Sequence, residues 1–500
     1  MKIDSLNAGA SAAKKAAAAG LLILLSVPAA GAEDFGLQVE HLLKVQSEKL
    51  YGVVAPLDDS APPTNGPYRT QSQNASDQVL LAHGLKVEYL TRNAGDLTDM
   101  IAFYPADDPT HLITCVEGAA TILSNGKRNP SVQRIDLETG AVATILRGMS
   151  RCDGIRTTPW GTILATEETT DGSAYEILNP LATTEVTITA RNGCGVAATI
   201  ASTPGSNNVV KRTALPCMAW EGLIVQASGV VIGGDELRPG TSIGDGGGGP
   251  NSDGGAIFKF VPTSPLTQPG PITDLLNSPL VAGTAHAMQV TCNGDNQQFG
   301  QGCEVGNAAW IPVSAASARA SANANGATGF YRPEDLEQDP LFTDPENPNA
   351  IRFCWTNTQE EDAMSFGEVM CAIDAAPLSA QANNRSVLVY RFIEGDEDFN
   401  SFDNLAFQPN SGNLYVIEDH NNGDIFACLP DGGDRDIKSD GCVKILSVKD
   451  SSAEPTGFIF DPTGNVAYLS IQHSNDTNMP LFDGYRTDDI LMISGFKIKD

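Results

Sequence analysis

The chain is 500 residues long and carries 31 Lys and Arg against 61 Asp and Glu, which gives a formal net charge of −30 at pH 7. Such an excess of negative charge repels DNA, RNA and anionic membranes over long range, so it excludes them as partners. The excess is compatible with carboxylate sites for hard cations such as Ca²⁺, and equally with a surface that only keeps the protein soluble.

The first 32 residues are predicted to be a cleaved signal peptide. Lys14 and Lys15 precede a short apolar run at 16–25, and the small residues at 30–32 (AGA) follow Pro28. A charged start, a short apolar segment and a small-residue cleavage site are the parts of a general secretory signal. No later run approaches the ~20 apolar residues of a membrane helix. We therefore expect a periplasmic or secreted protein whose residues 33–500 form one domain.

The rest of the chain is dominated by short apolar runs rich in Val, Ile, Leu and Thr, separated by Gly, Asn, Asp and Pro, which is typical of many short strands. One turn–strand–acid unit recurs, at 159–168 (PWGTILATEE), 409–419 (PNSGNLYVIED) and 462–473 (PTGNVAYLSIQH). Looser copies lie at 112–117 (LITCVE) and 230–236 (VVIGGDE). Repeated units with variable spacing predict an all-β fold, a β-propeller. A β-sandwich or two packed barrels is the alternative.

Three stretches are predicted to be insertions into this fold. Residues 239–255 are rich in Gly and Asp, residues 313–329 are rich in Ala, Ser and Asn, and residues 337–349 are acidic with three prolines. The first and third compositions indicate surface loops, and the second indicates a disordered segment or a weak helix.

Ten cysteines in an exported chain indicate disulfides. Proximity in sequence suggests four pairs, which leave Cys115 and Cys152 over. The suggested pairs are Cys194 with Cys217, Cys292 with Cys303, Cys354 with Cys371, and Cys428 with Cys442.

Acidic residues close the recurring unit. In a propeller the innermost strand of each blade runs along the central channel, so equivalent strand ends form a ring. Carboxylates crowded around one axis repel one another, and bound cations relieve that repulsion. We therefore expect a metal site, with acids that only cap strands at a solvated rim as the alternative. The acids are Glu117, Glu167, Glu168, Asp235, Glu236, Glu418 and Asp419.

Cys152 lies a few residues before the unit at 159–168. A thiolate beside carboxylates would favour a transition metal such as iron. The alternative is that Cys152 forms a disulfide with Cys115.

Taken together, seven stretches in chain order resemble the PhoX-type alkaline phosphatases. The first is TPWGT at 158–162 leading to TEE at 166–168 after Cys152, which is similar to the family's T-P-W-G-T-W-L-x-x-E-E. The others are WEG at 220–222, GDE at 234–236 with FKFV at 258–261, FYRPED at 330–335, FDNLAF at 402–407, YVIED at 415–419, and EPTG at 454–457 with QH at 472–473. The resemblance covers about residues 110–475.

The resemblance implies a six-bladed propeller, with loop and short helical insertions, that hydrolyses phosphomonoesters using Ca²⁺ and Fe³⁺. It implies Arg332 as the catalytic phosphate clamp, because a guanidinium can bond two phosphate oxygens at once, and Asn404 as a second substrate-binding residue. The metal ligands it implies are Cys152, Glu167, Glu168, Glu221, Asp235, Glu334, Glu418 and Glu454, with Glu117.

Some residues depart from the family pattern. Residues 153–157 are more polar than the family's Gly-rich turn, 115–117 replaces an expected H-E pair, and 216–220 lacks basic residues before Glu221. A general secretory signal in place of the family's twin-arginine signal means that metal is acquired outside the cytoplasm.

The sequence thus predicts a monomeric exported phosphatase that acts on small phosphoesters. A calcium-stabilised binding propeller without turnover, and a lactonase-like hydrolase, are the alternatives.

Overall fold

The computed structural model describes residues 35–65, 69–243, 251–268, 270–292, 297–300, 302–358, 365–430, 441–476 and 478–497. The predicted signal peptide, residues 1–32, lies outside the described residues, as does the part of the predicted 239–255 loop at 244–250.

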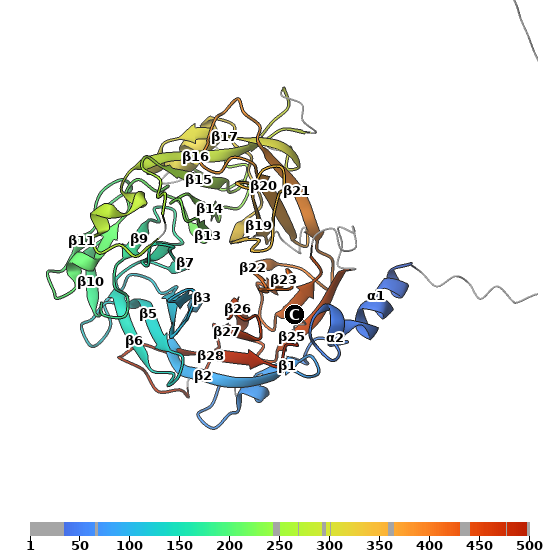
Figure 1. Cartoon of the computed structure of the whole chain (residues 1–500). Coiled ribbons are helices and arrows are strands. Elements are labelled where there is room, and N and C mark those ends of the chain that lie inside the picture. The colour runs from blue at the N-terminus through green and yellow to red at the C-terminus, as the bar shows by residue number, and fades with distance from the viewer. Residues whose placement is uncertain are drawn as a thin grey trace, which may run out of the picture.

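Strands arranged in a ring form the whole body of the molecule (Figure 1). Six inner strands surround its axis, each in contact with the next, and the last contacts the first. We number the blades 1 to 6 after these strands. They are β3 (Thr98–Tyr104), β7 (Cys152–Thr157), β13 (Trp220–Val225), β18 (Pro333–Gln338), β22 (Phe402–Phe407) and β26 (Glu454–Phe460). The predicted all-β propeller is therefore confirmed.

Each blade grows outward from its inner strand by antiparallel pairing. The second strands are β4 (His111–Val116), β8 (Ile163–Glu167), β14 (Val231–Asp235), β19 (Ile351–Asn357), β23 (Leu414–Glu418) and β27 (Val466–Gln472). The third strands are β5 (Pro130–Asp136), β9 (Ala174–Ile177), β15 (Ile257–Pro262), β20 (Glu368–Asp374), β24 (Asp424–Cys428) and β28 (Thr487–Ser494). The fourth strands are β6 (Val142–Arg147), β12 (Val209–Lys211), β16 (Gly283–Val290), β21 (Val387–Glu394), β25 (Cys442–Val448) and β2 (Lys86–Gly95).

Four further strands extend the blades. Strand β1 (Val79–Leu81) adds to β25, and β10 (Val186–Ala190) with β11 (Thr199–Ile200) adds to blade 1. Strand β17 (Gly306–Val313) pairs with both β16 and β21, so blades 3 and 4 share one nine-stranded sheet.

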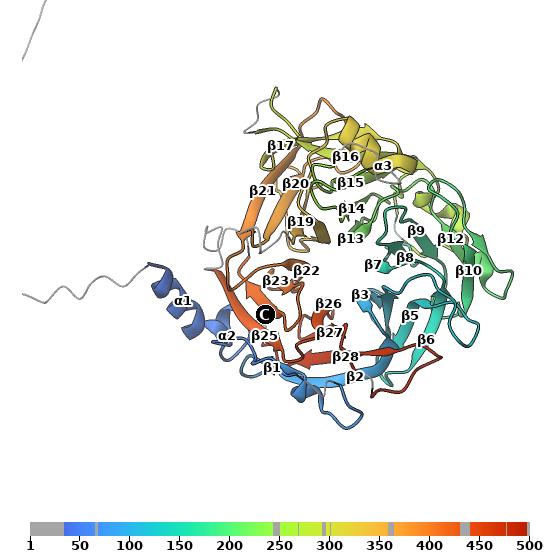
Figure 2. The same ribbon diagram turned by 180° about the vertical axis from the view of Figure 1, so that it is seen from behind.

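The ring is closed by strands from opposite ends of the chain. The N-terminal β2 pairs with β28 near the C-terminus, so blade 6 is built from both ends. Closure of this kind leaves few exposed strand edges. Helices α1 (Phe35–Val45) and α2 (Ser47–Leu50) lie outside the ring beside β25 and β1 (Figures 1 and 2). The described helices are all too short or too polar to cross a lipid bilayer.

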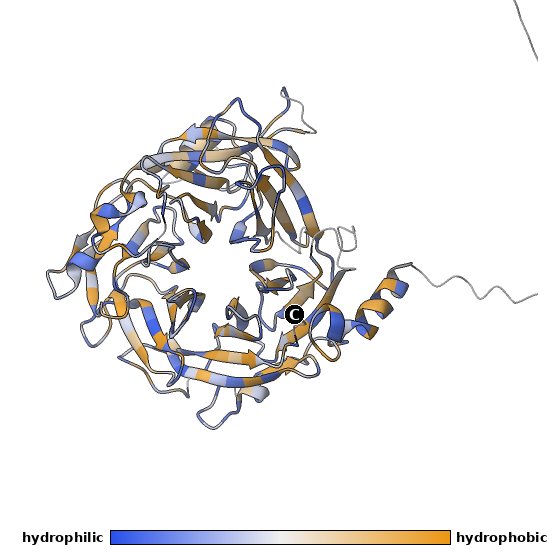
Figure 3. Ribbon diagram, viewed as in Figure 1, coloured by the Kyte–Doolittle hydropathy of each residue, from blue (hydrophilic) through white to orange (hydrophobic). Residues whose placement is uncertain are grey.

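Hydrophobic residues are concentrated on the strands of the blades, whereas the connecting loops are mostly hydrophilic (Figure 3). The core consists of clusters packed within and between blades, and all four Trp side chains are fully buried in it. The predicted insertion at 313–329 contains a short helix, α3 (Ala318–Ala324), in agreement with the expectation of a weak helix rather than a disordered segment.

The recurring turn–strand–acid units prove to be the second strands of their blades. The expectation that they line the channel was wrong, because the preceding strand of each blade lies further in. The residue that follows each unit's strand reaches the axis, and in blade 6 so does Gln472, the last residue of β27.

Candidate metal and phosphate site

The acids at the axis come from two equivalent positions in the blades. The first position, here the outer tier, is the residue directly after each second strand. Its members are Glu117, Glu168, Glu236, Thr358, Asp419 and His473. The other position, here called the inner tier, lies on the inner strand of each blade. In blades 1 to 5 it is the second residue of that strand, and in blade 6 it is the first. Its members are Asp99, Asp153, Glu221, Glu334, Asp403 and Glu454.

All of these residues except Thr358 line one axial pocket of about 150 Å³, together with Arg151, Arg332 and Gln472. The strand repeat explains why they converge, since the same position in successive blades points at the same axis. The pocket therefore gathers carboxylates that lie far apart in the sequence.

Burial and mutual repulsion raise the pKa values of several of these acids, among them Asp99, Glu168 and Glu334. Burial, followed by the charges of Glu117 and Glu236, raises the pKa of Glu168 to about 11. Burial also raises the pKa of Asp99 to about 7 and that of Glu334 to about 8. The site therefore takes up either protons or cations near neutral pH.

Two arginines form ion pairs with the pocket carboxylates and neutralise part of this negative charge. Arg151 Nε lies 2.8 Å from Glu168, and its Nη2 also contacts Glu117. Arg332 Nε lies 2.8 Å from Glu236, and its Nη2 lies 3.0 Å from Glu334. Burial opposes the charge on both guanidinium groups, but the neighbouring carboxylates outweigh it and raise the pKa of both.

The two arginines occupy equivalent places, directly before the inner strands β7 and β18. Both have left-handed backbones, with φ of 51° at Arg151 and 50° at Arg332. This conformation costs a non-glycine residue about 1–2 kcal/mol. The carbonyls of Arg151 and Arg332 accept hydrogen bonds from the backbone N–H groups of Glu168 and Thr358. Ladder bonds in the blades thus hold both arginines in a conformation that brings their side chains to the pocket.

The carboxylates form three groups that are close enough to share cations. Within each group, one oxygen per residue lies within 4.8 Å of the others. Two oxygens bound to one Ca²⁺ at 2.3–2.6 Å are at most about 5 Å apart, so each group fits one such ion. The groups are Asp99–Glu117–Asp153, Asp153–Glu168–Glu221 and Glu221–Glu334–Asp403. Asp153 and Glu221 are each shared by two groups, and the donor atoms are all carboxylate oxygens.

Three predicted ligands lie outside this pocket. Glu167, Asp235 and Glu418 are the last residues of their second strands and point away from the axis. Each accepts a hydrogen bond from a backbone N–H just ahead of the inner strand of its blade. Each also pairs with a basic side chain, Arg191 at Glu167, Arg319 at Asp235 and His420 at Glu418. Their positions do not support their assignment as ligands, because neighbouring residues of a strand point to opposite sides.

Asn404 is buried beneath the pocket instead of lining it. Its Oδ1 accepts hydrogen bonds from Thr456 Oγ1 at 2.7 Å and from the Gly457 N–H at 2.6 Å. The same hydroxyl oxygen lies 2.6 Å from Asp99 Oδ1. Asn404 thus joins blades 5 and 6, and its expected contact with substrate is not supported by its position.

The prediction that Cys152 is a metal ligand was wrong. Cys152 is bonded to Cys115, so it carries no free thiol. The four pairs suggested by sequence proximity are all confirmed, and the described chain contains no free cysteine. Disulfides at every cysteine indicate an oxidising compartment.

Six pocket residues were not foreseen: Asp99, Arg151, Asp153, Asp403, Gln472 and His473. Asp153 lies next to Cys152 and Asp403 lies next to Asn404, and in each case only the neighbour was predicted to be a site residue. Asp99 belongs to none of the recognised motifs. His473 Nε2 lies 2.9 Å from Glu454, and this hydrogen bond raises the pKa of His473 to about 9. A search for an acid at the second residue of each strand before the recurring unit would have found the three aspartates.

A comparison with known proteins agrees with the family resemblance of the sequence motifs. The family model of alkaline phosphatase PhoX matches residues 138–475. The chain belongs to the PhoX alkaline phosphatase family. Members of this family are phosphatases, so membership in the family indicates hydrolysis of phosphate esters. No curated protein matches the chain.

The chain is similar to several solved structures, and the first one below, with a TM-score of 0.55, shares the fold. PhoX from Pseudomonas fluorescens, in complex with vanadate, a transition state analogue, is 14% identical with a TM-score of 0.55, covering 87% of this chain and 97% of that one. A putative gluconolactonase is 9% identical with a TM-score of 0.40, covering 85% and 97%. The PQQ-bound aldose sugar dehydrogenase from Streptomyces coelicolor is 10% identical with a TM-score of 0.37, covering 83% and 99%.

Proposed function

We propose that this protein is an exported, metal-dependent phosphatase that hydrolyses phosphomonoesters in the axial pocket. The observation that carries the proposal is the meeting of buried carboxylates and Arg332 in one pocket of a PhoX-family chain. Small phosphoesters are the substrates, and the mature protein is periplasmic or secreted and acts as a monomer.

The carboxylates of the three groups would hold the metal. One buried oxygen, Asp153 Oδ1, has no hydrogen-bond partner among the described residues, as expected of a ligand atom. Ca²⁺ suits oxygen donors of this kind. Fe³⁺, the second ion implied by the family resemblance, would have to bind through carboxylates alone, because Cys152 is in a disulfide.

Arg332 would bind the phosphoryl group. Its side chain is largely buried and keeps its charge at every relevant pH, because Glu334 and Glu236 stabilise the cation against burial. A planar guanidinium orients two phosphate oxygens at once, which an ammonium cannot do. Arg332 would thereby fix the phosphorus relative to the carboxylate groups of the inner tier.

Bound metal ions would polarise the phosphoryl group and lower the pKa of a bound water. The residues of the chain supply everything else at the site. The carboxylates of the three groups would position the ions, Arg332 would orient the substrate, and the enclosing blades would keep the substrate charge away from bulk water, where electrostatic contacts are weak.

The test is a comparison of metal-free and reconstituted protein. Protein stripped with EDTA and dialysed is assayed with p-nitrophenyl phosphate before and after addition of Ca²⁺, while its metal content is measured by elemental analysis. We expect activity to be lost on stripping and restored by Ca²⁺. Calcium binding without any hydrolysis would favour the binding propeller, and hydrolysis of a lactone but not of the phosphoester would favour a lactonase.

A further inference from the structure

The pocket lacks the one sulfur donor that the family resemblance implies. A thiolate was expected at Cys152, yet the Cys152 side chain is fully buried and bonded to Cys115 of β4. The disulfide joins blade 1 to blade 2 inside a hydrophobic cluster. A sulfur in a disulfide has no charge to offer a metal, so this donor is absent from the site.

The position of Cys152 in its strand leads to the same conclusion independently. Cys152 is the first residue of inner strand β7, and Asp153 is the second. Because successive residues of a strand point to opposite sides, only one of the two can face the axis. The equivalent first residues in blades 3 and 5, Trp220 and Phe402, are buried in the core. In blades 2, 3 and 5 the first position is therefore a packing position, and the second is the one that faces the channel.

Asp153 has the properties of the missing ligand. Its side chain is 3% exposed, lines the axial pocket, and has a buried Oδ1 with no hydrogen-bond partner among the described residues. An unpaired buried carboxylate oxygen is costly unless a cation accompanies it. Asp153 also belongs to two of the three carboxylate groups, so it lies between two neighbouring cation positions.

We propose that the metal centre is held by oxygen donors alone, with Asp153 as a ligand shared by two ions, and that it works with hard divalent cations such as Ca²⁺ and without thiolate-bound iron. Oxygen donors favour hard ions, whereas a thiolate is what would select a softer one. The inference rests on the proposed function only in placing metal in this pocket. It concerns which atoms bind the metal, and not whether a phosphoester is turned over.

The first experiment uses the wild-type protein purified without reductant. Thiols are titrated with Ellman's reagent in guanidinium, iron and calcium are measured by elemental analysis, and the visible spectrum is recorded. We expect no titratable thiol, no iron and no thiolate–iron absorption band. Two titratable thiols per chain together with bound iron and a visible band would overturn the proposal.

The second experiment compares two neighbouring positions by calorimetric titration with Ca²⁺. Asp153→Asn keeps the size of the side chain but removes its charge. Loss of outer-shell partners already weakens metal affinity by about 10–100-fold, so loss of this ligand should weaken Ca²⁺ binding at least about tenfold. The double variant Cys115→Ser/Cys152→Ser should bind Ca²⁺ as the wild type does, with a lower Tm because a crosslink is lost.

Circular dichroism confirms that both variants are folded at the temperature of the titration. Full Ca²⁺ affinity in Asp153→Asn, or loss of it in the folded double variant, would refute the assignment. A wild-type protein that lacks thiols and binds Ca²⁺ but does not hydrolyse p-nitrophenyl phosphate would refute the proposed function and leave this inference standing.

Discussion

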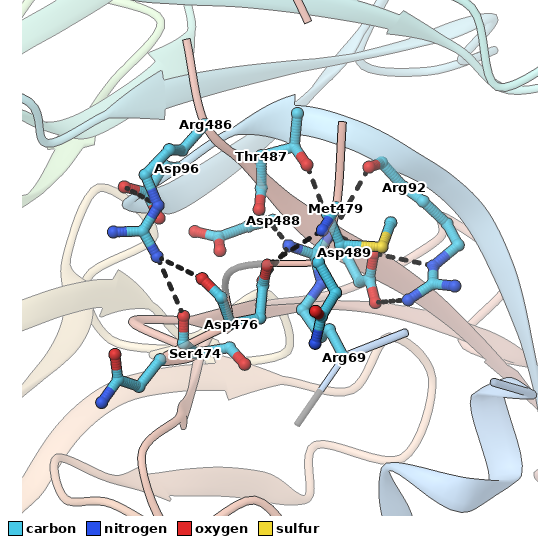
Figure 4. A network of polar contacts seen from close by, with 12 residues as sticks. Arg69, Arg92, Asp96, Ser474, Asp476, Met479, Arg486, Thr487, Asp488 and Asp489 are labelled. Atoms are coloured by element: carbon cyan, nitrogen blue, oxygen red, sulfur yellow. Dashed lines mark hydrogen bonds and ion pairs between the residues drawn. The ribbon is translucent and has the colours of Figure 1, made fainter. Parts of the chain in front are cut away.

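Arg69 connects the N-terminal segment to blade 6, and its removal is a direct test of how the ring is closed (Figure 4). Its guanidinium is 1% exposed and lies 2.8 Å from Asp476 and 2.5 Å from Asp489. It also donates to the carbonyl of Thr487. Burial opposes ionisation of Asp489, but the hydrogen bonds from Arg69 and Arg92 outweigh burial and lower its pKa.

The cost of Arg69→Met follows from these contacts. Methionine keeps much of the apolar stem and removes the charge, which leaves Asp476 and the Thr487 carbonyl without their partner. Breaking a buried ion pair by removing one member costs about 3–5 kcal/mol. Because Arg92 still pairs with Asp489 at 3.0 Å, we expect the lower part of this range, about 3–4 kcal/mol.

This free energy converts to a measurable shift in Tm. About 430 residues are described, and unfolding entropy is roughly 2.1 cal/mol/K per residue, so a molecule that unfolds as one unit has ΔS of about 0.9 kcal/mol/K. Arg69→Met should therefore lower Tm by about 3–5 °C in differential scanning calorimetry. It should also speed limited proteolysis of the segment that precedes β2.

Arg486→Met is the matched control. Arg486 lies in the same network but is 53% exposed, and its ion pair with Asp96 is 3.7 Å long. Exposed pairs contribute about 0–1 kcal/mol, so Tm should fall by about 1 °C or less. If Arg69→Met shifts Tm no more than Arg486→Met does, the buried network does not hold the ring closed and the reasoning fails.

Three further predictions concern the axial pocket. Because the folded-state pKa values of Asp99 (about 7) and Glu334 (about 8) exceed the unfolded value of about 4, the folded state binds more protons between these values, and metal-free protein loses stability as pH rises through that window. The Tm difference between Ca²⁺-loaded and EDTA-treated protein should therefore widen from pH 5 to 8; a constant difference would contradict this. Arg332→Ala should lower kcat/KM for p-nitrophenyl phosphate by about 10²–10³-fold, with partial recovery in Arg332→Lys and unchanged metal content, whereas full activity in Arg332→Ala would exclude it as the phosphate clamp. Glu168→Gln should reduce the calcium bound per chain, while Glu167→Gln should lower Tm and leave calcium unchanged; the reverse pattern would show that the two carboxylates have been assigned to the wrong sides of the strand.

The sequence located the acidic units correctly but could not say which acid of each pair faces the axis. Glu168, Glu236 and Asp419 line the pocket, whereas the residue before each of them is paired inside the blade. Both members of a pair are acidic, and both meet charged or polar partners. The side that each faces depends on where the strand ends and on how the blade packs, which composition does not encode.

The inner-tier aspartates were missed for a different reason. Asp99, Asp153 and Asp403 follow the first residue of three separate inner strands, and no local pattern marks them as a set. They become one site only because closure of the ring places equivalent positions around a common axis. Cys152 shows the converse, since a residue that chemistry favoured as a ligand lies on the core side of its strand.

What the sequence determined by itself was the kind of protein. Short strands with turn residues between them specify an all-β propeller, the motifs specify the family, and cysteine spacing identified four of the five disulfides. These features are local, so they can be read along the chain. The tertiary structure alone decided which carboxylates meet and that the Cys152 sulfur is bonded to Cys115. Those outcomes depend on strand alternation and ring closure, which bring together residues hundreds of positions apart.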